Sequence, residues 1–134
     1  MAKEVVVTQT LSEDMIEAGG RLIDHLDRGN FPVHAALWLY YLEAELWRLV
    51  IASPGIKSHG PRKTYMRVQA ILSQIPEGET RVGIQNISVV DADDLFISIL
   101  RSAIKTGQGI SGIRFSRNTI DGIFVEDAYI YRLI

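Results

Sequence analysis

The feature that most constrains the fold is an apolar stretch at residues 31–54. It contains both tryptophans and two of the five tyrosines. Its residues divide between those that favour helices and those that favour strands. Prolines bracket the stretch, and its least apolar part, residues 43–45, lies near its middle. That layout predicts a β-hairpin of strands 33–41 and 46–53, although the turn lacks glycine, asparagine and proline.

Both faces of the predicted hairpin are apolar. Alternate residues of a strand point to opposite sides, and aromatic or aliphatic residues occupy both sides of the first strand. Strands of this kind usually lie inside a sheet that helices cover on both faces. We therefore expect the hairpin to be the buried middle of the fold rather than a platform for stacking bases.

A helix is predicted before the hairpin. Thr10 followed by Glu13 fits a capping box, and apolar residues recur at helical spacing as far as residue 26. Gly19 and Gly20 each cost a helix about 1 kcal/mol relative to alanine. They indicate close packing on a neighbouring element or, alternatively, a hinge or ligand approach. Residues 1–9 precede the helix as a short strand or a loose arm.

Three further elements and a second hairpin follow. Asp121-Gly122 is a strong signal for a two-residue hairpin turn, with a rival turn at 117–119. In chain order we predict a loop at 55–60, a helix that begins at Pro61, a strand at 82–90, a helix at 95–104 capped by Asp91 or Asp93, and a hairpin of strands 112–120 and 123–132.

The predicted fold class is α/β, with α and β elements mixed in the order α-β-β-α-β-α-β-β. One mixed five-stranded sheet would carry three helices. Short strand–helix–strand connections form right-handed crossovers between parallel strands, so we predict two such units, at 46–90 and 82–120. A chain of 134 residues is normally one domain, and we expect residues 1–134 to form a single domain.

Composition excludes several classes of function. The chain has no cysteine, which excludes disulfides, thiolate metal sites and cysteine nucleophiles. It shows no signal-peptide pattern and no apolar run near the ~20 residues that a membrane span needs. We therefore expect a cytoplasmic protein without membrane contact. Phosphate-binding glycine motifs and a serine-hydrolase elbow are absent from the sequence.

The junction of loop and helix at residues 57–67 is the best candidate for a binding site. A helix N-terminus offers free N–H groups and the positive end of the helix dipole. Residues 54–76 carry four basic residues and no acidic one, although the net charge of the chain is −2. A solvated basic surface is the alternative. The predicted anion-binding residues are Lys57, Ser58, His59, Gly60, Arg62 and Lys63.

Acidic residues offer weaker candidates. Asp91, Asp93 and Asp94 could hold Mg²⁺, which prefers oxygen ligands, or could simply cap the helix that follows. Asp127 needs a partner if it is buried. Arg114, Arg48 or a tyrosine hydroxyl could serve, and we expect a structural ion pair. No two histidines stand at zinc-ligand spacing, and we predict no cofactor.

Three segments carry a resemblance to known sequences. They are Ala-Ala-Leu-Trp-Leu-Tyr with Leu-Trp-Arg-Leu-Val-Ile-Ala-Ser-Pro, Gly60-Pro61 before a helix that bears Tyr65, and the terminal Asp-Gly-Ile-Phe-Val-Glu-Asp-Ala-Tyr-Ile-Tyr-Arg-Leu. Together they resemble a group of small bacterial proteins that have no assigned function. The resemblance supports the first hairpin, although its turn at 42–45 departs from the group. It implies no catalytic or binding residue.

Three functional hypotheses follow. The first is a non-enzymatic interaction or accessory protein, acting as a homodimer or with an operon-encoded partner through an exposed apolar patch such as residues 129–131. The second is a phosphate-directed or metal-dependent enzyme, which requires the basic loop and the aspartates to lie within about 10 Å. The third is nucleic-acid binding through the same loop with Arg114 and Arg117.

Overall fold

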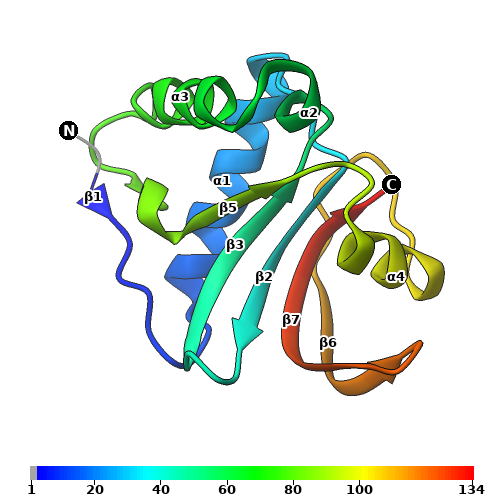
Figure 1. Ribbon diagram of the computed structural model, residues 1–134. Coiled ribbons are helices and arrows are strands. Elements are labelled where there is room, and N and C mark those ends of the chain that lie inside the picture. Colours follow the sequence, from blue (N-terminus) through cyan, green and yellow to red (C-terminus); the bar gives the residue numbers. More distant parts are fainter. Residues whose placement is uncertain (1–2) are drawn as a thin grey trace.

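The computed structural model describes residues 3–134 as a mixed sheet with helices on both faces (Figure 1). The predicted mixed class is confirmed, with four α-helices among these residues instead of three. The helices are α1 (Glu13–Arg28), α2 (Gly55–His59), α3 (Pro61–Leu72) and α4 (Leu95–Ala103). The strands are β1 (Lys3–Glu4), β2 (Ala35–Tyr41), β3 (Leu46–Ala52), β4 (Thr80–Arg81), β5 (Ile87–Val90), β6 (Ile113–Ile120) and β7 (Ile123–Leu133).

The main sheet has the strand order β5-β3-β2-β7-β6. β3 and β5 are parallel, which confirms the first predicted crossover. The second crossover is wrong, because β5 and β6 lie at opposite edges of the sheet. The observed strand order follows from the burial of β7, which has more buried residues than β6. β7 therefore takes the internal place beside β2, and its hairpin partner β6 is left at the edge.

The first predicted hairpin is confirmed, with Tyr41 opposite Leu46 at its turn. Glu45 adopts a φ of 52°, so a non-glycine residue fills the left-handed position of this turn. The second hairpin is also confirmed. Asp121 and Gly122 have φ values of 48° and 80°, which fit the turn that Asp-Gly favours.

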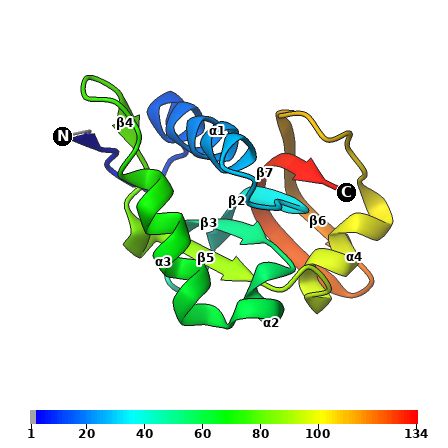
Figure 2. The same ribbon diagram turned by 90° about the horizontal axis from the view of Figure 1, so that it is seen from above.

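The sheet separates two apolar cores, as its two-sided composition predicted. On one face Trp38, Leu49 and Ile51 belong to the core that includes α1 and α3 residues. On the other face Leu37, Val50 and Ala52 pack with residues of α4 and β7. Figure 2 shows α1 and α3 on one side of the sheet and α4 on the other.

Several predicted boundaries are wrong for local reasons. Ser12, not Thr10, caps α1: its Oγ accepts a hydrogen bond from Met15 N at 3.2 Å, and two acidic residues then fall in the first turn, where the helix dipole favours them. Asp94, not Asp91 or Asp93, caps α4.

Other corrections concern short segments. Residues 55–59 form helix α2 instead of a loop, and a 3₁₀ turn at Ile84–Asn86 shortens the strand predicted at 82–90. The N-terminal strand is β1, which pairs with β4; residues 1 and 2 of the predicted segment lie outside the described residues. Within residues 3–134, every helix is too short or too polar to cross a bilayer.

Gly19 marks a close contact between α1 and the sheet, which confirms the packing interpretation. Trp38 Nε1 donates to Tyr131 Oη at 3.0 Å and to Met15 O at 3.1 Å. Tyr131 Oη donates in turn to Ile16 O at 2.6 Å. A Cβ on Gly19 would lie 2.8 Å from Trp38 Nε1 and closer still to Tyr131 Oη. Only a residue without a side chain lets α1 approach these hydrogen bonds.

The buried hydroxyl of Tyr131 predicts a loss of stability in alkali. Burial raises the pKa of Tyr131 well above its ordinary value, against the opposing hydrogen bond from Trp38. Above pH about 10 the unfolded chain loses this proton while the folded chain keeps it. The free energy of unfolding should therefore fall as the pH rises above about 10.

Urea unfolding of wild type and Tyr131→Phe at pH 8 and pH 11 checks this. The variant should be less stable by about 1 kcal/mol at pH 8 but should lose less on going to pH 11. If both proteins lost the same free energy of unfolding between pH 8 and pH 11, groups other than Tyr131 would cause the alkaline loss.

Candidate functional site

Lys57 is engaged by acidic residues. Its Nζ lies 3.4 Å from Asp93 Oδ2 and 3.9 Å from Asp91 Oδ2. A hydrogen bond with Asp91, followed by the charge of Lys57, lowers the pKa of Asp93. The basic loop and the aspartates thus adjoin, as the enzyme hypothesis required. The same ion pairs partly offset the charge of Lys57, whose side chain is 74% exposed.

The other predicted anion-binding residues separate around α2. Ser58, His59 and Lys63 line a hollow of about 220 Å³ with Phe31 among its walls. Ser58 Oγ donates to Pro54 O at 3.1 Å instead of capping α3. Gly60 precedes α3 with a φ of 83°, and neither Gly60 nor Arg62 lines this hollow. Three of the six predicted residues therefore share one hollow beside helix α2, and anion binding here stays a prediction.

The three candidate metal-ligating aspartates have separate roles. Asp94 Oδ2 accepts a hydrogen bond from Ile97 N at 3.2 Å as the cap of α4, while Asp91 and Asp93 contact Lys57. Within residues 3–134 no three histidine, aspartate or glutamate side chains are grouped so that they could hold a metal ion.

Asp127 forms the structural ion pair that the sequence predicted. Arg114 Nε and Nη2 donate to its two carboxylate oxygens at 2.6 and 2.5 Å. The neighbouring Arg117 lies 3.9 Å from Glu126. The two arginines proposed for nucleic-acid contact are therefore both beside carboxylates, and nucleic-acid binding stays a prediction.

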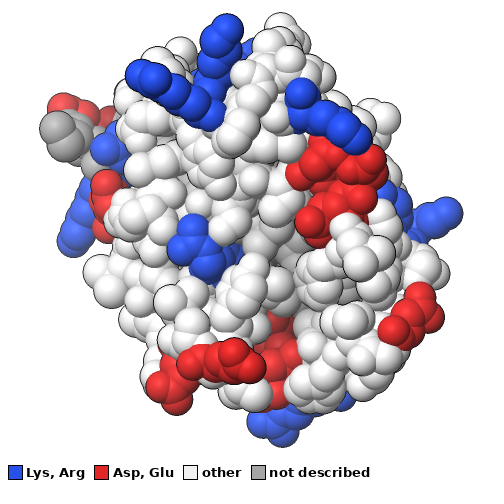
Figure 3. All heavy atoms as spheres, in the orientation of Figure 1, with Lys and Arg blue, Asp and Glu red and all other residues white. Residues whose placement is uncertain are grey.

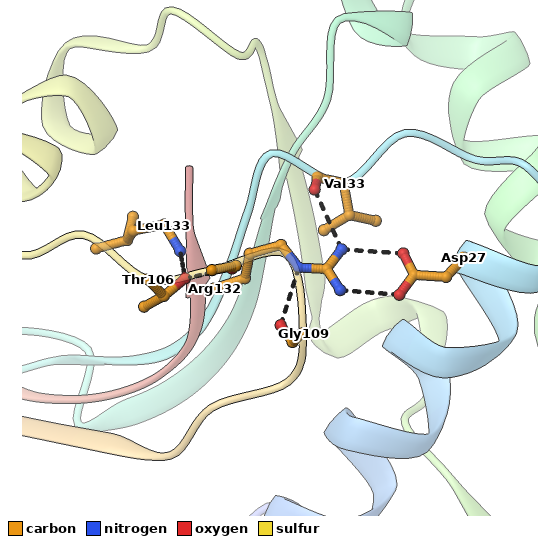
Figure 4. A network of polar contacts seen from close by, with 7 residues as sticks. Asp27, Val33, Thr106, Gly109, Arg132 and Leu133 are labelled. Atoms are coloured by element: carbon orange, nitrogen blue, oxygen red, sulfur yellow. Dashed lines mark hydrogen bonds and ion pairs between the residues drawn. The ribbon is translucent and has the colours of Figure 1, made fainter.

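Another ion pair, which the sequence did not reveal, connects β7 to α1 (Figure 4). Arg132 Nη1 and Nη2 donate to the carboxylate of Asp27 at 2.9 and 2.8 Å. Arg132 also donates to the backbone oxygens of Val33 and Gly109. Its side chain is 4% exposed, so this charge is satisfied inside the protein and serves the fold.

The predicted apolar patch at residues 129–131 is not exposed. Ile130 and Tyr131 are buried and Tyr129 is half-buried. β7 lies inside the sheet, and its apolar side chains belong to the two cores. The large exposed apolar side chains of the described residues lie outside this segment.

An apolar groove of about 430 Å³ opens on the α4 face of the sheet. Helix α4 has nine residues and is about 14 Å long, whereas the eleven residues of β7 span about 37 Å. The helix thus covers only part of this face, beside the upper half of β7 in Figure 1. The groove is lined by Leu39, Tyr40, Tyr41, Leu42, Val50, Val90, Asp94, Phe96, Phe124, Val125 and Glu126.

Apolar side chains from three separate segments line this groove, and those of two segments are exposed. Tyr41 and Leu42, at the turn after β2, are 39% and 56% exposed. Phe124, at the start of β7, is 56% exposed, whereas Phe96 of α4 is half-buried. Single exposed apolar residues are ordinary, and the feature of note here is that several of them line the same groove. Partial burial raises the pKa of Tyr41. The positive charge of Arg48 opposes this rise, and the negative charge of Asp94 adds to it.

Acidic side chains border the groove. Asp94 and Glu126 belong to its lining, and the exposed Glu43 and Glu45 lie in the adjoining turn. Figure 3 shows a largely uncharged area on this face. Acidic groups lie below it, over the β2–β3 turn, and above it, between α2 and α4, and basic groups lie to its left and above the upper acidic group. The groove therefore combines an apolar floor with a rim of mixed charge.

Sequence reasoning missed this groove, although two signals were present. Leu42 is a large apolar residue in a turn with two glutamates, and Ile123-Phe124 follows directly after the Asp-Gly turn. Apolar residues at hairpin ends are poorly placed to reach a core, so they are the ones that remain exposed.

Comparisons of this chain with protein-family models, with curated proteins and with solved structures found no match.

Proposed function

We propose that this protein is a non-enzymatic interaction protein, acting in the cytoplasm, that binds a segment of another polypeptide in the apolar groove. The observation that carries the proposal is the convergence of Tyr41, Leu42 and Phe124, all more than a third exposed, on one hollow of about 430 Å³. Fully burying an aromatic or leucine side chain of this kind contributes about 1.5–3 kcal/mol. Because these three side chains are already about half-buried, a partner that covered them would gain roughly half of this value from each.

The floor of the groove belongs to the second core. It consists of Leu39, Val50 and Val125, which are members of that core and come from three internal strands. Little ordering of the protein itself would accompany binding, which favours affinity. A bound segment would complete the layer that α4 begins.

Selection of random peptides on the immobilised full chain tests this function, because it assumes no partner in advance. Fluorescence anisotropy would then compare enriched peptides on wild type, Phe124→Asp and Met66→Asp. Met66 is a matched control, since it is 61% exposed on α3, outside the groove. Phe124→Asp should weaken binding by more than about tenfold, and Met66→Asp should bind like wild type.

Circular dichroism would confirm that both variants keep the fold. The proposal fails if no peptide is enriched, or if the enriched peptides bind Phe124→Asp as well as they bind wild type.

A further inference from the structure

The main sheet is split beside the groove. β2 and β7 pair only as far as Leu39 and Ala128. Both strands continue past this point: β2 runs on to Tyr41, where it still pairs with β3, and β7 runs back to Ile123, where it still pairs with β6. In Figure 1 the lower ends of the β2–β3 and β6–β7 hairpins turn away from each other. Each strand end therefore pairs on one side only, and the two open sides face each other.

The split has a hollow on each face of the sheet. The groove on the α4 side is lined by residues 39–42 and 124–126. A second hollow, of about 270 Å³, lies on the α1 side, since Trp47 of the first core lines it. The polar residues in the lining of this second hollow include Gln9, Ser116, Arg117 and Asp127. Tyr40 and Glu126 line both hollows, so the two hollows lie on the two faces of one gap between the strand ends.

The open side of β7 specifies the conformation of an occupant. Residues 123–127 span about 17 Å. Successive residues of an antiparallel pair direct their N–H and C=O groups alternately toward the partner strand and away from it, so part of this backbone points away from β6, toward the gap. An extended chain offers matching N–H and C=O groups along such an edge. A helix satisfies its own backbone groups and would use only the side chains.

The two hollows specify the side chains of an occupant. Successive residues of a strand point to opposite faces. In a strand that lay in the gap, one set of side chains would therefore enter the groove over Leu39, Val50 and Val125, which belong to the second core. The other set would face the polar hollow on the α1 side. The gap thus fits a segment in which apolar and polar residues alternate.

Charge complementarity favours an uncharged set of polar residues. The charged side chains of β6 and of residues 123–127 form pairs of opposite sign: Arg114 donates to Asp127, and Arg117 lies 3.9 Å from Glu126. These pairs add no net charge to the gap. A lysine or a glutamate of the occupant would therefore find no uncompensated partner among them.

Resting on the proposed docking function, we infer that the groove takes an extended segment of another polypeptide, which adds to the sheet as a strand beside residues 123–127 of β7. Its apolar residues, at positions i, i+2 and i+4, contact Val125 and the neighbouring floor, and uncharged polar residues between them face the α1-side hollow. A second copy of this chain is the poorer occupant. Within residues 3–134 every strand already belongs to a sheet, and an edge strand carries its own sheet with it, so it does not fit between two other strands.

The peptides enriched in the selection described above test the inference. They should alternate apolar and uncharged polar residues, and their Kd should change less than about twofold between about 50 mM and about 500 mM salt. N-methylation of successive peptide residues should weaken binding about five- to tenfold at alternate positions, where an N–H pairs with β7, and the intervening positions are the control. Nuclear Overhauser effects should connect backbone protons of the peptide with those of residues 124–126.

Each alternative outcome has a separate meaning. Peptides with helical apolar spacing, or without backbone contacts to β7, that still fail to bind Phe124→Asp overturn the added strand and leave groove docking standing. Peptides that bind Phe124→Asp as well as wild type overturn both. Backbone contacts to residues 113–119 instead would place the peptide at the outer edge of β6 and contradict the inference. If wild type forms a dimer in sedimentation experiments and Phe124→Asp is a monomer, the occupant is a second copy and the inference is wrong.

Discussion

Replacing Gly19 with alanine is expected to lower the free energy of unfolding by about 2–3 kcal/mol. The new Cβ would overlap Tyr131 Oη and lie 2.8 Å from Trp38 Nε1. Neither atom can retreat freely, because the two are hydrogen-bonded to each other and to backbone oxygens of α1. The overlap outweighs the gain of about 1 kcal/mol that alanine brings to a helix.

Gly20→Ala is the matched control, with an effect of opposite sign. The nearest atom to a Cβ at this position is Tyr131 Cε1 at 3.7 Å, which is an ordinary contact. Only the helix propensity then changes, so the variant should be more stable by up to about 1 kcal/mol. Urea unfolding followed by tryptophan fluorescence measures both variants. Changes of the same sign would contradict the close contact at Gly19.

Asp27→Ala is expected to cost about 2–4 kcal/mol of stability. The change leaves Arg132, whose side chain is 4% exposed, with the carbonyl groups of Val33 and Gly109 but without its paired countercharge. The effect stays below that of a fully buried pair, because the side chain of Asp27 is 40% exposed and water can reach the site.

Asp24→Ala, one turn earlier on the same helix, is the control. Asp24 pairs with Arg28 at 3.0 Å, but the two side chains are 46% and 73% exposed. An exposed pair of this kind contributes at most about 0.5 kcal/mol. Chemical denaturation of both variants gives the comparison, and similar losses in the two would show that the Asp27–Arg132 pair has no special role.

The sequence predicted those parts of the fold that local pattern controls. The β2–β3 hairpin and its two-sided burial follow from apolar residues on both faces, and the Asp121-Gly122 turn follows from backbone preference. Strand order depends instead on which distant strands pair. After α4 the chain runs to the far edge of the sheet, so the rule that successive strands are neighbours failed between β5 and β6.

The candidate sites show the same difference between features set by local sequence and features set by contacts of distant segments. The predicted anion-binding residues, Lys57 to Lys63, are close in sequence, but the short helix α2, which no apolar periodicity indicates, places only Ser58, His59 and Lys63 around one hollow and leaves Lys57 beside Asp91 and Asp93. The groove joins Tyr41, Phe96 and Phe124, which are far apart in the chain. Each of them alone is indistinguishable from a core residue, and only the tertiary structure shows that they meet at the surface.

The central position of β7 has a consequence for synthesis of the chain. β7 follows the other strands in chain order, yet it pairs with β2 near the other end of the sequence, as Ala35 does with Leu133. Until residues 123–133 leave the ribosome, the nascent hairpin of β2 and β3 exposes apolar faces and an unpaired edge, which favours association with other chains. Folding must therefore wait for the end of translation of this region, and a chaperone that shields the hairpin would raise the yield of folded protein.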